Sequence, residues 1–142
     1  AFHRFETLEF AAKIGVKARA LGAPRVLSEA QLQMAIQTST PATFTRQAVS
    51  SEERELRGLL RDFVQRAYRQ RLFISTQGSF SARLDASSFL ITPNRVDRGY
   101  LEARDLVLVR DGMAEAGTAP SRATSLHAAV YAAHPEIGAL VN

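Results

Sequence analysis

The sequence of 142 residues contains no cysteine. Disulfide bridges and thiolate metal sites are therefore excluded, and we expect a cytoplasmic setting. The chain also has no apolar run of about 18 residues, the length that a helix needs to cross a bilayer. No stretch combines the charged, apolar and small-residue regions of a signal peptide. We therefore expect no membrane partner.

Lysine is scarce, because Lys13 and Lys17 are the only two and the other sixteen basic residues are arginines. Eighteen basic and fourteen acidic residues give a net charge of +4. Six arginines lie between Arg54 and Arg71, a pattern that a nucleic-acid surface can have. Acidic residues are interspersed among them, and no aromatic residues alternate with them as stacking platforms. We interpret this segment as the solvated face of a helix and expect no nucleic-acid partner, with nucleic-acid binding as the weaker alternative.

Several catalytic signatures are missing from the sequence, among them GxSxG, a Walker loop, GxGxxG and HExxH. The three histidines are His3, His127 and His134, and none belongs to an HxH pair. On a helix, His127 and His134 would lie about 10 Å apart along the axis, which is too far to share one metal ion directly. We expect His127 to pack at the sheet and His134 to cap a helix end.

Hydrophobic residues make up 46% of the chain and charged residues 23%, as in a folded domain of ordinary size. Apolar periodicity and turn residues predict helices at about 7–21, 29–37, 51–70 and 122–133. They predict strands at 80–84, 89–92, 106–110 and 137–142, and a strand or helix exit at 72–75. The polar stretch 38–50 is the expected linker. The order of elements predicts a mixed α/β protein with helices packed on a sheet.

Local signals mark the ends of some of these elements. Ser28 with Gln31 predicts a capping box at the start of the second helix, and Ser50 predicts a second box at the start of the third. Asp111-Gly112 is a strong signal for a hairpin after the third strand.

The third helix carries one long apolar stripe. From this stripe we expect Leu60 and Phe63 to be buried and Arg61 and Arg66 to be largely exposed.

From about Glu52 to Asn142 the sequence resembles the class II aldolase/adducin family. Each marker alone is weak, but they come in the family's order and at compatible spacings. They are Ala67-Tyr68-Arg69-Gln70-Arg71-Leu72, Gly78-Ser79-Phe80-Ser81-Ala82-Arg83, Leu90-Ile91-Thr92-Pro93, Asp105-Leu106-Val107-Leu108-Val109, Pro120-Ser121, His127, Tyr131, His134-Pro135-Glu136 and Gly138-Ala139-Leu140-Val141.

The resemblance implies a three-layer α/β/α fold with a predominantly antiparallel sheet, of which residues 51–142 form the N-terminal half of a domain. Residues 5–37, with the segment Leu21 to Ser28, resemble the C-terminal helices of a preceding copy. The expected organisation is therefore a helical tail at 1–37, a linker at 38–50 and the aldolase-like domain at 51–142. The alternative is that residues 1–37 are an unrelated helical arm. The resemblance also implies a homo-oligomer.

Family members bind the phosphate of their substrates through backbone amides and small hydroxyl side chains. The positions here that match this part of the family pattern are Gly78, Ser79, Thr92, Ser121 and Arg122. Ser79 stands where the family usually has asparagine, and Arg122 stands in the place of a second serine. A phosphate or sugar phosphate is thus the expected small-molecule partner. The alternative is that Gly78 and Thr92 only shape tight turns.

The catalytic part of the family pattern is missing from this chain. Family members use a zinc ion held by three histidines to polarise a carbonyl group, and a glutamate to move protons. Ala123 stands in the place of the glutamate, and Asn142 stands in the place of the first zinc histidine. We therefore expect no catalytic residue, no metal ligand and no cofactor in this chain, with zinc belonging to the parent protein.

Two functional hypotheses follow from the resemblance. In the first, the parent protein is an aldehyde-lyase that acts on a sugar phosphate or a related hydroxy-carbonyl compound, and this segment alone is inactive. In the second, the segment is a non-catalytic, adducin-like domain for assembly or ligand binding.

Overall fold

The computed structural model describes residues 2–36, 41–46 and 48–142 of the chain. Its contacts divide the chain into two units, Ala1–Thr40 and Pro41–Asn142. No helix among the described residues is long and apolar enough to span a bilayer.

The first unit consists of two helices, α1 (Phe2–Leu21) and α2 (Glu29–Ile36). The expected capping box begins α2, because the amide of Gln31 donates to Oγ of Ser28 (3.3 Å) and the amide of Ser28 donates to Oε1 of Gln31 (2.9 Å). Helix α1 begins five residues before the expected start at Thr7. Residues 1 and 37 of the expected tail and residues 38–40 and 47 of the expected linker lie outside the described residues.

The second unit is built on a six-stranded sheet with the order β1-β5-β4-β3-β2-β6. All neighbouring strands pair antiparallel except β1 and β5, so the mixed α/β, mainly antiparallel class is confirmed. The strands are β1 (Thr43–Phe44), β2 (Phe80–Arg83), β3 (Ser88–Ile91), β4 (Val107–Arg110), β5 (Met113–Glu115) and β6 (Ala139–Val141). Residues 72–75 form no strand, and β1 lies inside the stretch expected to be a linker.

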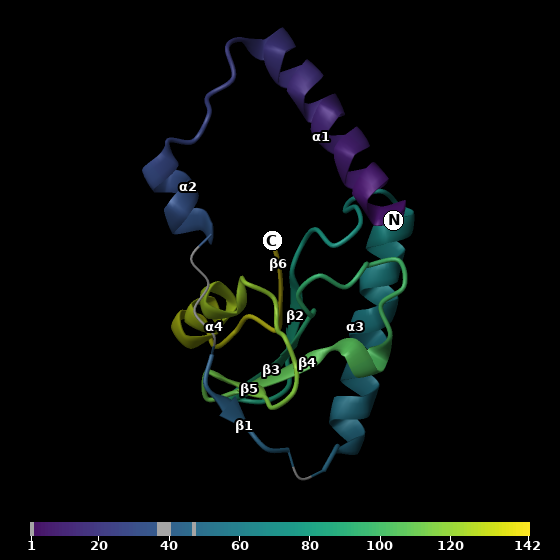
Figure 1. Cartoon of the computed structure of the whole chain (residues 1–142). Coiled ribbons are helices and arrows are strands. Elements are labelled where there is room, and N and C mark those ends of the chain that lie inside the picture. The colour runs from purple at the N-terminus through teal and green to yellow at the C-terminus, as the bar shows by residue number, and fades with distance from the viewer. Residues whose placement is uncertain (1, 37–40, 47) are drawn as a thin grey trace. The chain divides into compact units, whose positions relative to one another are not determined.

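Two helices cover the two faces of this sheet, which makes the three layers (Figure 1). Helix α3 (Ser51–Arg69) packs its Leu60 and Val64 against side chains such as Leu90 from one face. On the other face, Tyr131 of helix α4 (Thr124–Ala133) packs with Phe89 and other side chains of β3 and β4. Successive residues of each strand point to opposite faces, so neighbours in sequence belong to different core clusters.

The expected hairpin joins β4 to β5 at Asp111-Gly112. Both residues have positive φ, 50° and 75°, and Arg110 pairs with Met113 across the turn. These dihedral angles match a two-residue turn whose twist suits the strands it joins. The hairpin prediction is confirmed, although the short strand β5 was not expected.

The stripe on α3 is rotated from the one that apolar spacing predicts. Leu60 is buried as expected, but Phe63 is 55% exposed and that prediction was wrong. The buried line begins at Glu53 and Arg57 and continues through Leu60, Val64 and Ala67. Because successive residues of a helix are rotated by about 100°, Phe63 lies at the edge of this buried line. Its ring packs edge-on against the ring of Phe80, with 6.2 Å between the ring centroids.

A cluster of alternating charges, formed by Arg46, Glu53, Arg57 and Glu115, explains the rotation. Arg57 Nε lies 2.7 Å from the carboxylate of Glu53, and Arg46 lies 3.3 Å from Glu53 and 3.0 Å from Glu115. Glu53 is 2% exposed and Arg57 is 6% exposed, so their charges need each other as partners. The cluster joins α3 to β5 and to the segment after β1.

Candidate functional site

Three of the residues expected to bind phosphate lie together at one end of the sheet. Ser79 precedes β2, Thr92 follows β3 and Ser121 precedes α4. The hydroxyl groups of Ser79 and Ser121 share a hydrogen bond, and the amide of Ser121 donates to the carbonyl oxygen of Thr92 at 3.0 Å. All three residues are buried. The structure thus brings together hydroxyl groups from three separate segments.

A short ladder of backbone contacts holds the segments that carry Thr92 and Ser121. Pro93 and Pro120 form an antiparallel bridge, and the amide of Asn94 donates to the carbonyl oxygen of Ala119 at 2.8 Å. Thr92 Oγ1 accepts a hydrogen bond from the amide of Phe80 at 3.1 Å. The acceptor side of this hydroxyl therefore joins the end of β3 to the start of β2, while its proton stays available as a donor.

The conformation and packing of its own loop require glycine at position 78. Its φ is +74°, and a Cβ atom there would lie 2.7 Å from Cε1 of Phe73 and closer still to Cδ1. Only glycine adopts this backbone conformation without strain and leaves room for the ring. Its contribution to the site is the shape of the loop that presents Ser79.

The start of helix α4 lies next to the serine pair. The amides of Ala123 and Thr124 donate to Oγ and to the carbonyl oxygen of Ser121, at 3.3 and 3.1 Å. Ala123 occupies the N-cap position and offers no side-chain cap. The side chain of Arg122 is exposed and makes no hydrogen bond or ion pair within the described part of the chain. An exposed cation therefore accompanies the buried hydroxyl groups.

Arg98 is a buried residue of this region that the sequence did not single out. It is 2% exposed, and its guanidinium donates to three backbone carbonyl groups, those of Gly78, Pro93 and Val96. Burial lowers the pKa of Arg98 to about 10, against the opposing effect of the Asp97 charge. Nothing in the sequence distinguishes this arginine from its exposed counterparts, because it stands in a polar loop.

His127 lies at the centre of a second polar group on the α4 face of the sheet. Its Nδ1 is 2.6 Å from Oγ of Ser81, which is 2.8 Å from the hydroxyl of Tyr131. Its Nε2 is 2.9 Å from Oδ1 of Asn142. Because a carbonyl oxygen only accepts, Nε2 carries a proton, and Nδ1 accepts from Ser81 in that tautomer. Burial raises the pKa of Tyr131, although the Ser81 hydrogen bond and the Arg83 charge oppose the rise.

These residues do not fit a catalytic zinc ion. Such a site needs three protein ligands and an open position. Both nitrogens of His127 are already engaged, His134 lies 3.1 Å from the carboxylate of Glu136, and an amide stands at position 142. Within residues 2–36, 41–46 and 48–142, no three His, Cys, Asp or Glu residues come together as a metal-binding group.

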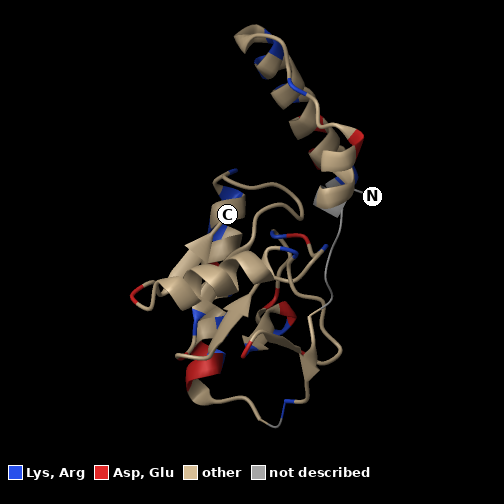
Figure 2. Cartoon of the chain, turned by 90° about the vertical axis from the view of Figure 1, so that its left-hand side faces the viewer, with Lys and Arg blue, Asp and Glu red and all other residues tan. Residues whose placement is uncertain are grey.

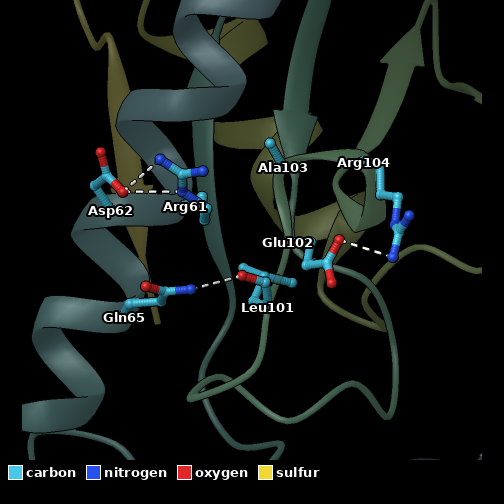
Figure 3. Close-up of a pocket in the computed structure, with 7 residues that line it drawn as sticks. All are labelled: Arg61, Asp62, Gln65, Leu101, Glu102, Ala103 and Arg104. Atoms are coloured by element: carbon cyan, nitrogen blue, oxygen red, sulfur yellow. Dashed lines mark hydrogen bonds and ion pairs between the residues drawn. The ribbon is translucent and has the colours of Figure 1, made fainter.

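A pocket of about 510 Å³ opens elsewhere, between α3 and the turn η1 (Ala103–Asp105). Its charges are already paired, with Arg61 2.7 Å from Asp62 and Arg104 2.8 Å from Glu102 (Figure 3). Gln65 donates to the carbonyl oxygen of Leu101 at 2.9 Å. None of the residues expected to bind phosphate lines this pocket.

The charges of α3 alternate in sign as the sequence indicated, but the interpretation of this segment as a solvated face was wrong for Arg57, which is 6% exposed, and for Glu53, which is 2% exposed. Arg57 pairs with Glu53, and Arg61 pairs with Asp62. Acidic and basic residues are mixed over the ribbon of the second unit (Figure 2).

Comparison with known families shows what kind of domain carries the serine site, which we define as Ser79, Thr92 and Ser121. The profile described as "Class II Aldolase and Adducin N-terminal domain" matches residues 59–141, more than half of the chain. The chain belongs to the class II aldolase and adducin family. The match contains every residue expected to bind phosphate, from Gly78 to Arg122. The family resemblance inferred from the sequence is confirmed.

Among curated relatives in this family, a methylthioribulose-1-phosphate dehydratase of Sodalis glossinidius is 37% identical over 70 residues, which are 48% of this chain and 35% of that protein. The enzyme of the same name from Pectobacterium carotovorum is 39% identical over 70 residues, 48% of this chain and 34% of that protein. The chain thus spans about a third of the length of these relatives.

Solved structures show the same fold. YgbL of Klebsiella pneumoniae matches with a TM-score of 0.59 and 28% identity over 63% of this chain and 44% of that one. An L-fuculose 1-phosphate aldolase of Glaciozyma antarctica matches with a TM-score of 0.58 and 20% identity over 70% of this chain and 43% of that one. The second likeness concerns the fold alone.

Proposed function

We propose that this chain carries the phosphate-binding part of a class II aldolase-family site. The parent protein would act as an aldehyde-lyase on a sugar phosphate or a related hydroxy-carbonyl compound. In this copy, Ala123 replaces the proton-transferring glutamate and Asn142 replaces the first zinc histidine, so the segment by itself is inactive.

The observation that carries the proposal is the convergence of Ser79, Thr92 and Ser121. Two serine hydroxyl groups hold two protons, and their mutual hydrogen bond uses one, which leaves one donor for a ligand oxygen. The start of α4 adds a partial positive charge that favours an anion at Ser121. Arg122, exposed in the same turn, supplies a full positive charge that suits a phosphate oxygen.

The names of the curated relatives agree with this ligand class. The methylthioribulose-1-phosphate dehydratases are named for a compound with a phosphate on the first carbon. We infer a ligand with the same general chemistry, a short hydroxylated chain that ends in a phosphate ester.

The rest of the proposal concerns the parent protein. The first helical unit, at 1–37, is proposed to be the end of a preceding domain of the same family, with 38–50 as the connection. Zinc and the catalytic glutamate would then belong to another copy or chain, in a cytoplasmic homo-oligomer. An intact HxH pair in the sequence that precedes Ala1 would support this organisation.

A second function is favoured by the residues that have replaced the catalytic ones. His127 uses both of its ring nitrogens inside the protein, and an amide and a methyl group stand at positions 142 and 123. These features suit an adducin-like domain for ligand binding or assembly. A parent protein that binds a sugar phosphate but cleaves none would support this alternative.

Calorimetric titration of the intact protein tests the anion site. We expect a sugar 1-phosphate to bind, inorganic phosphate to compete with it, and the unphosphorylated sugar to bind at least about tenfold more weakly, because it lacks the charge-assisted hydrogen bonds. Ser121→Ala should weaken binding, whereas Ser125→Ala, at an exposed position of α4, should not. Absence of phosphate-ester binding at millimolar concentration would contradict the proposal.

A further inference from the structure

The guanidinium of Arg98 connects two loops that lead to the serine site. Its Nε and Nη2 donate to the carbonyl oxygen of Gly78 at 3.1 and 2.8 Å. Its Nη1 donates to the carbonyl oxygens of Pro93 and Val96 at 3.1 and 2.8 Å. One buried side chain therefore joins the loop before β2 to the loop after β3.

Each of the two loops has a peptide group fixed on both sides. The peptide between Gly78 and Ser79 gives its oxygen to Arg98, and its N–H donates to the carbonyl oxygen of Asn142 at 2.8 Å. The peptide between Pro93 and Asn94 gives its oxygen to Arg98, and its N–H donates to Ala119 at 2.8 Å. Ser79 directly follows the first peptide, and Thr92 directly precedes Pro93. The orientation of both hydroxyl-bearing residues thus depends on peptide planes that Arg98 holds.

The charge of Arg98 has no carboxylate partner within the described residues, where it forms no ion pair. The carboxylate of its neighbour Asp97 instead accepts a hydrogen bond from the amide of Gly99 at 2.8 Å. A buried cation bound only to carbonyl groups is costly, and the nearby Asp97 charge offsets part of that cost without forming an ion pair. A phosphate group at the neighbouring serines would supply a further negative charge.

We propose that Arg98 is a positioning residue for the anion site, which holds the peptides at 78–79 and 93–94 so that Ser79 and Thr92 face one ligand and which adds a buried positive charge beneath it. This inference rests on the proposed function, since it assigns Arg98 to the same phosphate site. Arg98 does not touch the ligand in this arrangement and acts through the two loops.

The test compares Arg98→Lys with a matched control, Arg83→Lys, in the intact protein. Lysine keeps the charge but has no planar fork for carbonyl groups on two loops. Arg83 also donates to three backbone carbonyl groups, those of Tyr131, His134 and Ile137, but it lies at the other end of β2. Both substitutions should reduce stability, so stability alone does not separate the two roles.

Two measurements, ligand binding and amide hydrogen exchange, separate a positioning role from a purely structural one. Arg98→Lys should weaken the binding of a sugar 1-phosphate by about tenfold or more, the equivalent of one lost hydrogen bond to a charged group, while Arg83→Lys changes it less than about twofold. In the ligand-free protein, amide hydrogen exchange at Ser79 and Asn94 should accelerate in Arg98→Lys and stay unchanged in Arg83→Lys. Arg98→Gln, which keeps polar contacts without the charge, should bind more weakly than Arg98→Lys.

The outcomes distinguish this inference from the proposed function. If the unsubstituted protein binds the phosphate ester and Arg98→Lys binds it equally well, the role of Arg98 is wrong and the anion site stands. If the unsubstituted protein binds no phosphate ester, the proposed site is wrong, and the role of Arg98 fails with it. If neither Arg98 variant folds, Arg98 serves folding rather than positioning, and the inference is likewise overturned.

Discussion

Ser79 and Ser121 share a hydrogen bond between their hydroxyl groups, although 42 positions separate them in the chain. The contact joins the segment before β2 to the segment before α4. It is largely buried, with both residues 8% exposed. A ligand phosphate that reaches this pair would meet one uncommitted hydroxyl proton beside the first turn of a helix.

From the hydrogen bond between Ser79 and Ser121 we expect that the two serines do not act independently on a ligand. Ser79→Ala and Ser121→Ala should each weaken sugar-phosphate binding by about tenfold, the size of one hydrogen bond to a charged group. The double variant should lose little more than either single one, because each substitution already breaks the pair. A double-mutant cycle by calorimetry measures this, and strictly additive losses would show that the serines act separately.

From the raised pKa of Tyr131 we expect the protein to lose stability in alkaline solution. Burial raises its pKa above the ordinary value of 10.0, so the folded protein keeps the phenolic proton at a pH where the unfolded chain has lost it. Below pH 10 both states hold the proton and the contribution is fully present. As pH rises through 10 and on to the folded pKa, the unfolded state binds fewer protons, and the free energy of unfolding falls.

Tyr131→Phe removes this titrating group and leaves the ring. It should cost about 1 kcal/mol at neutral pH through the lost hydrogen bond to Ser81, and it should lose less stability than the unsubstituted protein above pH 10. Urea unfolding from pH 7 to 11 provides the measurement. Parallel curves for the two proteins would contradict the assignment of the alkaline loss to Tyr131.

Leu60 and Phe63 lie on the same helix and should respond differently to truncation. Leu60 is 6% exposed within the core, so Leu60→Ala should cost about 2–5 kcal/mol. Phe63 is 55% exposed and keeps only an edge contact with Phe80, so Phe63→Ala should cost about 1 kcal/mol. Denaturant unfolding of both variants checks this, and equal losses would place Phe63 in the core after all.

The difference between these two residues shows where sequence patterns reach their limit. Apolar spacing placed α3 and its buried Leu60 correctly, and Asp111-Gly112 placed the β4–β5 hairpin, because both signals are local. The rotation of α3 depends on Glu53 and Arg57, which a hydrophobic pattern counts as exposed. Their burial requires Arg46 and Glu115, from distant segments, as partners.

In the candidate site too, some residues could be predicted from the sequence and others could not. Ser79, Thr92 and Ser121 were selected by the order of family markers, and the fold brings them together. Arg98 was missed because its role depends on carbonyl groups, which every residue has and which no sequence pattern marks. Strand β1 was also missed, since it is two residues long and its pairing with β5 is not local.

Gly78 and Gly112 have nearly the same backbone conformation but different surroundings. Substitutions at the two positions can therefore distinguish the cost of backbone strain from the cost of crowding. Gly78 has φ of +74° and Gly112 has φ of +75°, but a Cβ at Gly78 would run into the ring of Phe73, while nothing lies within 4 Å of a Cβ at Gly112. Gly112→Ala should therefore cost about 1 kcal/mol, from the left-handed conformation alone. Gly78→Ala should cost a further 1–3 kcal/mol or so, because the ring is forced out of its packing.

Truncation of the ring provides the decisive control for Gly78. Phe73→Ala is destabilising by itself, because Phe73 packs edge to face on Phe80 at 4.7 Å. In that background, however, the additional cost of Gly78→Ala should fall to the cost of Gly112→Ala, since only the backbone strain remains. Urea unfolding of the four variants measures the difference. If the cost of Gly78→Ala is the same with and without the Phe73 ring, crowding is not the reason for glycine at this position, and a need for close approach to a ligand becomes the better explanation.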